Sequence, residues 1–243
     1  VLQEIKVAIE NAQNPVELVS VSKEHSEPEE TKTEQKREQF AGVKLQGITQ
    51  HVIEIHQEYP LYKTCSLPVT YLDFSDEFFD TRKTQKILNQ IQQVIQKEAP
   101  ISQSLLSKRI LSAWGISRLG VRLKEYLDGL YGRLNLKYTR QNGTYFYWKQ
   151  EQNPEAYNTF RIPDNEKHKR SAEDLPKEEI AAGMVEILTN QISLPADDLV
   201  KETARLFGYA RLGGNVEQAM KTGIKHALKK GIIDENNERI VLV

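Results

Sequence analysis

The sequence repeats itself around a six-residue stretch: Gly115-Ile116-Ser117-Arg118-Leu119-Gly120 recurs 93 residues later as Gly208-Tyr209-Ala210-Arg211-Leu212-Gly213. Apolar positions on both sides follow the same spacing: Ile87 corresponds to Ile180, Leu106 to Leu199, Trp114 to Phe207 and Leu127 to Met220. Core positions that match across three predicted helices at one fixed offset indicate that a single fold occurs twice.

The residues around the first copy predict three helices followed by a hairpin. The spacing of Ile87, Ile91 and Val94 is typical of an amphipathic helix, which ends at Ala99-Pro100. Ser102 stands where a second helix needs its N-cap. A third helix is expected to bury five side chains: Leu119, Leu123, Tyr126, Leu127 and Leu130.

Asn142-Gly143 lies between two alternating runs, 135–139 and 144–148, and predicts a tight β-hairpin. Three helices and then a hairpin is the order of a winged helix. We therefore expect a mainly α-helical α+β protein with two tandem winged-helix (helix-turn-helix) domains. The predicted divisions are the tail of an upstream domain (1–14), a linker (15–43), an extended segment that packs on the first domain (44–82), winged helix 1 (83–150), a second linker (151–174) and winged helix 2 (175–243).

The shared motif has a physical interpretation. Its first glycine, Gly115 or Gly208, is expected to end the second helix in a left-handed conformation. Its second glycine, Gly120 or Gly213, is expected to allow a close approach where the third helix begins. The arginine between them stands at the helix end that a helix-turn-helix fold directs at nucleic acid.

Charge is distributed unevenly along a chain whose formal net charge is −1. Residues 99–149 carry nine basic side chains against Glu125 and Asp128, whereas residues 1–82 are acidic and residues 175–243 are balanced. A cationic block raises the local concentration of polyanions. The residues expected to bind nucleic acid are Lys108, Arg109, Arg118, Arg122, Lys124, Arg133, Arg140, Asn142 and Arg211.

Within this set, Arg118, Arg122 and Lys124 are expected to project from the third helix on the side opposite Leu119, Leu123 and Leu127. Arginine suits phosphates because its planar fork donates two hydrogen bonds at once. An alternative for Arg118 and Arg211 is that they cap or brace the fold, since both copies keep them.

Several stretches also resemble a known family: Lys97-Glu98-Ala99-Pro100-Ile101, Gly115-x-x-Arg118-x-Gly120-x-Arg122 and Leu175-Pro176-Lys177-Glu178-Glu179-Ile180. They are similar to a bacterial domain of unknown function at the C-terminal end of large superfamily 1 helicase-like proteins. The resemblance covers residues 60–243. Such proteins often carry a Vsr-like endonuclease domain just before this region, and some are linked to phage defence. The resemblance implies linked helicase and nuclease domains as partners and no catalytic residues here.

Catalysis by the chain itself is not expected, and neither is a cofactor. His51 and His56 lack the spacing of a zinc-protease motif, and the acidic residues Asp73, Asp76, Glu77 and Asp80 are expected to form a solvated loop rather than a metal site. The lone Cys65 favours the cytoplasm, and no apolar run is long enough to span a membrane. The first residue, Val1, indicates a piece of a longer polypeptide.

Two functions remain open from the sequence. The first is a non-catalytic DNA-binding accessory module that positions nucleic acid for a linked motor or nuclease. The alternative is a protein-docking module, because winged helices also bind proteins and a fold alone does not determine function.

Overall fold

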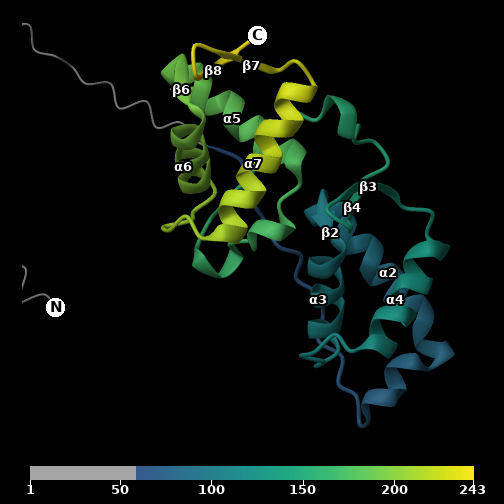
Figure 1. The fold of residues 1–243 in the computed structure, drawn as a ribbon. Helices are drawn as coiled ribbons and strands as arrows, with labels where there is room; N and C mark the ends of the chain where they lie inside the picture. Colours follow the sequence, from purple (N-terminus) through teal and green to yellow (C-terminus); the bar gives the residue numbers. More distant parts are fainter. Residues whose placement is uncertain (1–58) are drawn as a thin grey trace, which may run out of the picture. The chain divides into compact units, whose positions relative to one another are not determined.

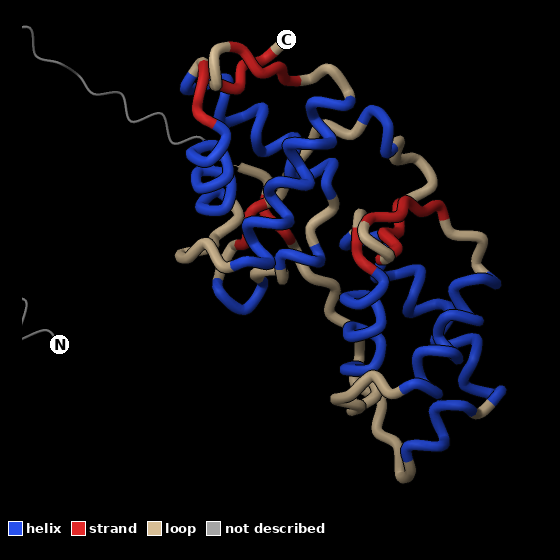
Figure 2. Tube along the Cα trace, in the orientation of Figure 1, coloured by secondary structure: helices blue, strands red, loops and turns tan. Residues whose placement is uncertain are grey.

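The computed structural model describes residues 59–243, which contain both copies of the repeat (Figures 1 and 2). The predictions for residues 1–14 and 15–43, and those for His51 and His56, lie outside the described residues. The described chain is mainly helical with small sheets, which confirms the predicted α+β class.

The first lobe, residues 81–148, carries three helices and a three-stranded antiparallel sheet. Its elements are α2 (Thr81–Glu98), β2 (Ile101–Ser102), α3 (Gln103–Ala113), α4 (Val121–Arg133), β3 (Lys137–Gln141) and β4 (Thr144–Trp148). The sheet has the order β2-β4-β3. Ser102 caps α3, because its Oγ accepts a hydrogen bond of 3.0 Å from the backbone N–H of Leu105. The hairpin turns through Asn142 and Gly143, which both have a positive φ.

The second lobe, residues 177–242, repeats this order. Its elements are α5 (Lys177–Gln191), β6 (Ser193–Pro195), α6 (Ala196–Leu206), α7 (Gly214–Lys229), β7 (Ile233–Asn236) and β8 (Arg239–Leu242). Its sheet has the order β6-β8-β7, which matches that of the first lobe strand for strand. The two short strands β2 and β6 were not anticipated from the sequence, because strands of two and three residues show no alternation.

The first glycine of the motif ends its helix as predicted. In the first lobe, Gly115 has φ +69°, its N–H donates to Ser112 O, and the N–H of Ile116 donates to Leu111 O at 2.9 Å. Gly208 has φ +83° and lies in the same pair of hydrogen bonds at the end of α6. These two hydrogen bonds satisfy carbonyl groups that have no partner within the helix. The positive φ that they require is most easily adopted by glycine.

Two predictions for the motif are wrong. A Cβ on Gly120 or on Gly213 would meet nothing within 4 Å, so these glycines permit no close approach; they are extended N-cap residues of α4 and α7. Leu119 is 42% exposed instead of buried, because α4 begins only at Val121 and Leu119 lies in the loop before it. Leu212, at the same place in the second copy, is exposed as well.

Each lobe has its own hydrophobic core. The first is built around Ile91, Leu106 and Leu127, and the second around Ile180 and Met220 with their neighbours. Segments outside the repeat complete both cores. The chain before α2 adds Tyr62 and Phe78 to the first core, and the chain between the lobes adds Phe160 and Ala172 to the second.

The segments outside the lobes carry short elements of their own. These are β1 (Leu61–Tyr62), η1 (Ser75–Phe79), η2 (Pro154–Ala156), β5 (Ile162–Pro163), η3 (Glu166–His168) and η4 (Ala172–Asp174). β1 and β5 pair in parallel, so the predicted linker 151–174 is joined to the chain that precedes α2. This pairing brings the segment's arginines to a buried position between elements of both lobes.

Arg161 connects the two lobes. Its Nη1 donates to Glu98 O at 2.8 Å and its Nη2 to Pro100 O at 2.9 Å, both at the end of α2. Its Nε donates to Glu179 Oε1 at 2.5 Å, on α5. Arg170 forms an ion pair with the same carboxylate. Glu179 is fully buried, so its charge depends on these two guanidinium groups.

A second buried carboxylate, Glu98, completes this network. It accepts hydrogen bonds from the Tyr62 hydroxyl, from the backbone N–H of Cys65 at 2.8 Å and from Arg109 Nε at 3.0 Å. The Arg170 guanidinium stacks 4.2 Å from the centre of the Tyr62 ring. Burial raises the pKa of the Tyr62 hydroxyl, and the Glu98 charge raises it further, so the hydroxyl remains a donor.

Candidate nucleic-acid interface

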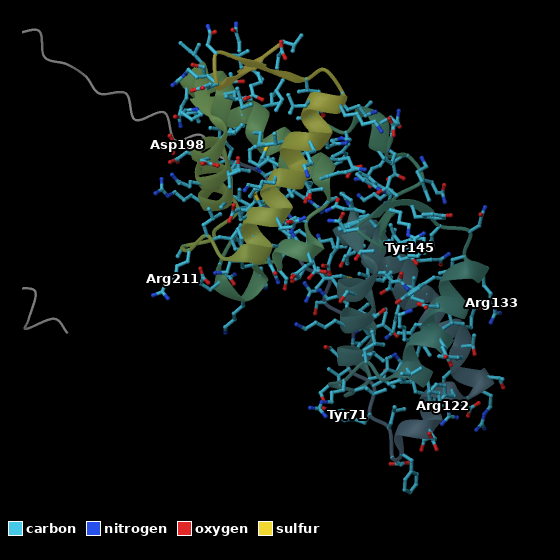
Figure 3. The ribbon with its side chains drawn as sticks, in the orientation of Figure 1. Tyr71, Arg122, Arg133, Tyr145, Asp198 and Arg211 are labelled. Carbon is cyan, nitrogen blue, oxygen red and sulfur yellow. The ribbon has the colours of Figure 1, made fainter. Side chains whose placement is uncertain are left out.

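The loop between α3 and α4 holds Arg118 in solvent. The hydrogen bonds from the N–H groups of Gly115 and Ile116 end α3. The next four residues, 117–120, are exposed, and α4 begins at Val121. Arg118 is exposed and forms no hydrogen bond or ion pair with any residue of the described chain. Arg211 has the same exposed position before α7 (Figure 3). The idea that these arginines brace the fold therefore gains no support.

The prediction that Arg118, Arg122 and Lys124 project together is wrong. Successive residues turn about 100° around a helix, so Arg122 and Lys124 lie on opposite flanks of α4. Arg122 lies over the Phe79 ring, 4.1 Å from its centre, and donates to Asp76 Oδ1 at 2.9 Å. Lys124 donates to Asp128 Oδ2 at 2.7 Å.

The middle of the outward face of α4 carries no cation. Opposite the buried Leu127 and Leu130, the exposed residues are Val121, Glu125, Gly129 and Gly132, and Arg122, which lies on the same side of the helix as Gly129, is paired with Asp76. A helix that reads base edges in a major groove places long polar side chains there. The exposed cations of the first lobe lie instead on the helix flanks, the preceding loop and the hairpin.

Arg109 is a correction to the predicted set. Its Nε donates to both carboxylate oxygens of the buried Glu98, at 3.0 and 3.1 Å, and its side chain is largely buried. It belongs to the network between the lobes. The sequence could have indicated this position, because Arg109 follows the outward-facing Lys108 by one residue and so turns toward the core side of α3.

The remaining cations are accessible. Lys108, Arg133 and Arg211 are exposed, and their side chains form no hydrogen bond or ion pair within residues 59–243. Figure 3 shows Arg122 and Arg133 near the two ends of α4. Arg140 lies 5.5 Å from the centre of the Tyr145 ring, and Asn142 is exposed at the tip of the hairpin.

Three of the four acidic residues in the cluster before α2 form ion pairs. Asp80 pairs with Arg82, which lowers the pKa of Asp80 to about 2, and Glu77 pairs with Lys83 at 2.5 Å. Asp76 pairs with Arg122. In the part of the chain that the structure describes, no three His, Cys, Asp or Glu side chains are grouped as a metal site would need. Burial raises the pKa of the Cys65 thiol, which disfavours a reactive thiolate.

A pocket between α4 and the hairpin was not predicted from the sequence. It has a volume of about 390 Å³, and four tyrosines line it: Tyr131, Tyr138, Tyr145 and Tyr147. Gln103 and Asp128 also line it, and Gln103 Nε2 donates to Asp128 Oδ1. The alternation of tyrosines along the hairpin was the signal available in the sequence, because it places three of them on one face.

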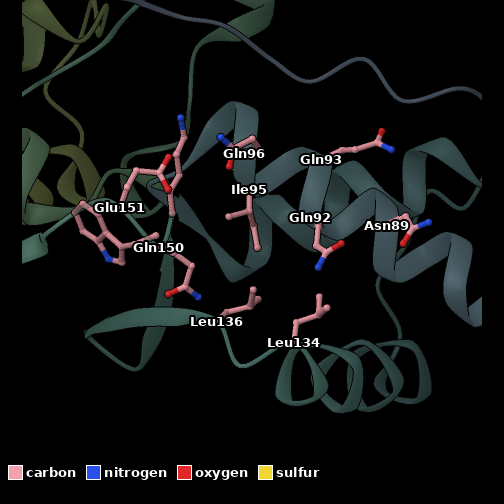
Figure 4. A pocket seen from close by; sticks show the side chains of 11 residues that line it. Asn89, Gln92, Gln93, Ile95, Gln96, Leu134, Leu136, Gln150 and Glu151 are labelled. Atoms are coloured by element: carbon pink, nitrogen blue, oxygen red, sulfur yellow. The ribbon is translucent and has the colours of Figure 1, made fainter.

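A larger hollow of about 710 Å³ lies on another side of Leu136 (Figure 4). Amide side chains of α2, among them Gln92, Gln93 and Gln96, form one wall, and Leu134 lies across from them. Its aromatic residue, Trp148, is buried and its indole N–H donates to Thr139. This hollow therefore offers hydrogen bonds but no accessible ring face.

No helix of the described residues combines the length and the apolarity that crossing a membrane requires. Comparison with known families finds one match: residues 76–125 match a family described as "Protein of unknown function (DUF3320)". No curated protein and no solved structure matches the chain. The matched residues run from η1 through α2 and α3 into α4, so they include Lys108, Arg118, Arg122 and Lys124 but not the hairpin with Arg140. This part of the first lobe is thus similar to a domain of unknown function.

Proposed function

We propose that each lobe is a winged helix and that the first lobe is a DNA-binding accessory module without catalytic activity. The observation that carries this proposal is the set of exposed basic side chains around α4 and the hairpin of the first lobe, of which Arg118, Arg133 and Arg140 form no ion pair within residues 59–243. The order of helices and strands and the sheet order β2-β4-β3 support the winged helix.

Phosphate contacts explain this set better than base readout does. Arg118 lies before α4, Arg140 and Asn142 lie on the hairpin, and Arg122 and Lys124 flank the helix. Because the outward face of α4 offers Val121, Glu125 and two glycines, and Arg122 beside it is paired with Asp76, we propose binding that depends little on base sequence.

We also propose that this activity serves a larger protein of which the chain is a part. The resemblance to the C-terminal region of helicase-like proteins with a Vsr-like nuclease domain supports a module that holds DNA for a linked motor or nuclease in the bacterial cytoplasm. In some such proteins the pathway is phage defence. The second lobe keeps Arg211 at the position of Arg118 but lacks the cations of the helix itself: Asn215 replaces Arg122 and Glu217 replaces Lys124. We propose that this lobe contacts protein.

Protein docking by the first lobe is the second candidate, and a specific observation favours it. Large apolar side chains are exposed near the α3–α4 loop: Val69, Tyr71 at 91%, Phe74, Leu119 and Val121 at 76%. The hydrogen bond of 2.6 Å from Thr70 N to Ala113 O places the 69–71 segment beside the end of α3. Exposed apolar groups of this kind mark interaction sites.

A salt titration separates the two candidates. Binding of labelled random-sequence duplex and single-stranded DNA is measured by fluorescence anisotropy from about 50 mM to 200 mM salt, where each neutralised phosphate steepens the loss of affinity. Arg118→Gln combined with Arg140→Gln is expected to weaken binding at least about tenfold and to reduce the salt slope by about two. Arg205→Gln, which removes an arginine already paired with Glu202 in the second lobe, is the matched control.

Two outcomes would count against DNA binding. One is no measurable binding at the lowest salt, and the other is equal loss in the Arg205→Gln control. Either result, together with a partner that is lost on Val121→Asp, would favour the docking function.

A further inference from the structure

The hairpin of the first lobe presents one aromatic face. In the register of β3 and β4, Tyr138 pairs with Tyr147 and Arg140 pairs with Tyr145. Paired residues lie on the same face of a sheet, so these four side chains share one face and their neighbours Thr139 and Phe146 the other. Tyr138 is 58% exposed. The pocket walls thus offer an open ring face.

α4 closes the pocket opposite this face. Tyr131 lies one turn after Asp128, and its ring is 5.3 Å from the ring of Tyr147. The Tyr131 hydroxyl bonds to Ser107 Oγ at 2.8 Å, which holds the ring in position. Tyr138 and Tyr145 meet edge to face at 5.2 Å. The rings are therefore positioned before any ligand binds.

The charges around the pocket select between two ligand classes. Tyrosine cages can bind organic cations, and a negative charge beside the rings strengthens that binding whereas a positive charge weakens it. Asp128, the acid in this pocket, is already neutralised by Lys124 and bonded by Gln103. Arg140 adds a positive charge beside Tyr145. Burial raises the pKa of the Tyr147 hydroxyl, so it adds no negative charge. These surroundings disfavour a cation and favour a neutral flat ring attached to phosphates.

We propose that this tyrosine pocket receives an unpaired nucleobase, so that the first lobe prefers DNA with a single-stranded segment. The inference rests on the proposed DNA binding and deepens it. The base stacks on Tyr138 between α4 and the hairpin, while Arg140, which lies on the same face of the hairpin, is within reach of a flanking phosphate. Stacking on aromatic side chains tolerates any base, which agrees with binding that is independent of sequence.

The second lobe does not repeat the tyrosines of this pocket. At the positions equivalent in sheet register, Glu235 replaces Tyr138 and Ile240 replaces Tyr147. On the helix, Ile224 replaces Tyr131 and Lys221 replaces Asp128. The pocket is therefore a property of the first lobe and not of the shared fold.

The test compares two strands that differ only in their bases. Affinities for a short oligothymidylate and for an abasic strand of the same length are measured by fluorescence anisotropy, using the full chain and its variants. Tyr138→Ala is expected to weaken binding of the oligothymidylate by about 5- to 100-fold and to leave the abasic strand unaffected. Tyr138→Phe keeps the ring and is expected to retain most of the affinity. Tyr71→Ala, which removes another exposed tyrosine outside the pocket, is the control, and melting temperatures check the fold.

The outcomes are distinguishable. If the wild type binds both strands equally and Tyr138→Ala changes nothing, the pocket inference fails while DNA binding stands. If neither strand binds at low salt, both fail. If a peptide bearing trimethyl-lysine binds and is lost on Tyr138→Ala while the oligothymidylate does not depend on Tyr138, the pocket is a cation site and the inference is overturned.

Discussion

The two lobes show how one fold can carry two different surfaces. Their helices, sheet orders and glycine-closed turns correspond, and each has a separate core. Their surfaces differ: the residues of the tyrosine pocket belong to the first lobe alone, and although Arg211 repeats the exposed Arg118, Asn215 replaces Arg122 and Glu217 replaces Lys124. The duplicated pattern therefore maintains folding, whereas the positions around it are free to take separate functions.

The first prediction concerns the buried contact between the lobes. Glu179→Gln removes the carboxylate charge that Arg161 and Arg170 share, and should lower the free energy of unfolding by about 3–5 kcal/mol. Urea denaturation followed by circular dichroism measures this. Glu217→Gln, which removes an exposed carboxylate paired with Lys221, should leave the midpoint nearly unchanged. Equal effects of the two variants would show that the network does not hold the lobes.

The second prediction contrasts equivalent positions on the third helices. Leu130 is buried in the first core, whereas Gly223 takes its place in the second lobe and lets α7 approach α5. Leu130→Ala should cost about 2–5 kcal/mol through a cavity. Gly223→Ala should cost about 1–3 kcal/mol through crowding, because its Cβ would lie 2.3 Å from Ile180 Cγ2. Denaturant midpoints of the two variants check both signs, and a stabilised Gly223→Ala would contradict the packing.

The third prediction uses the two helix-ending glycines. Gly115→Ala should cost about 1–2 kcal/mol, since φ +69° strains a residue with a Cβ but nothing else lies near it. Gly208→Ala should cost more, because its Cβ would also lie 2.9 Å from Pro163 Cγ. Melting curves of the two variants give the comparison. If Gly115→Ala destabilised the protein more than Gly208→Ala, the segment around Pro163 would be shown to move aside at little energetic cost.

The fourth and smallest effect is a pH dependence confined to the second lobe. His226 occupies the position of the exposed Arg133, and burial, aided by Lys177 and Lys229, lowers its pKa below 6.5. As pH falls through 6.5, the unfolded chain takes up a proton that the folded chain resists, so stability decreases. His226→Gln should flatten the melting temperature between pH 7.5 and 5.5, a range set about the ordinary histidine pKa. If the melting temperature of His226→Gln changed with pH as steeply as that of the wild type, His226 would not be the cause of the pH dependence.

Much of the fold could be predicted from the sequence because local chemistry determines it. The Ser102 cap, the Asn142-Gly143 turn and the Gly115 helix end each depend on contacts within a few residues. Periodic apolar residues indicated α2 correctly. Leu119 was placed wrongly because apolar spacing alone does not show where a helix begins.

The candidate site was less predictable. Arginine is a residue type that binds phosphate, but the guanidinium of Arg109 donates to the carboxylate of Glu98 on the neighbouring helix α2. Arg122 and Lys124 are two residues apart in sequence but lie on opposite flanks of α4. The tyrosine pocket needs α4 and two strands together, so no single stretch revealed it.

The sequence by itself determined the duplication, the helix and turn positions and the location of the cationic block, because these follow from periodicity, capping and composition. Only the tertiary structure decided which cations remain accessible, which carboxylates are buried with arginines between the lobes and which tyrosines face one another. The physical reason is that burial and pairing depend on residues distant in sequence. The Arg161 side chain, for example, donates to the backbone carbonyl of Glu98, and no local sequence pattern indicates that contact.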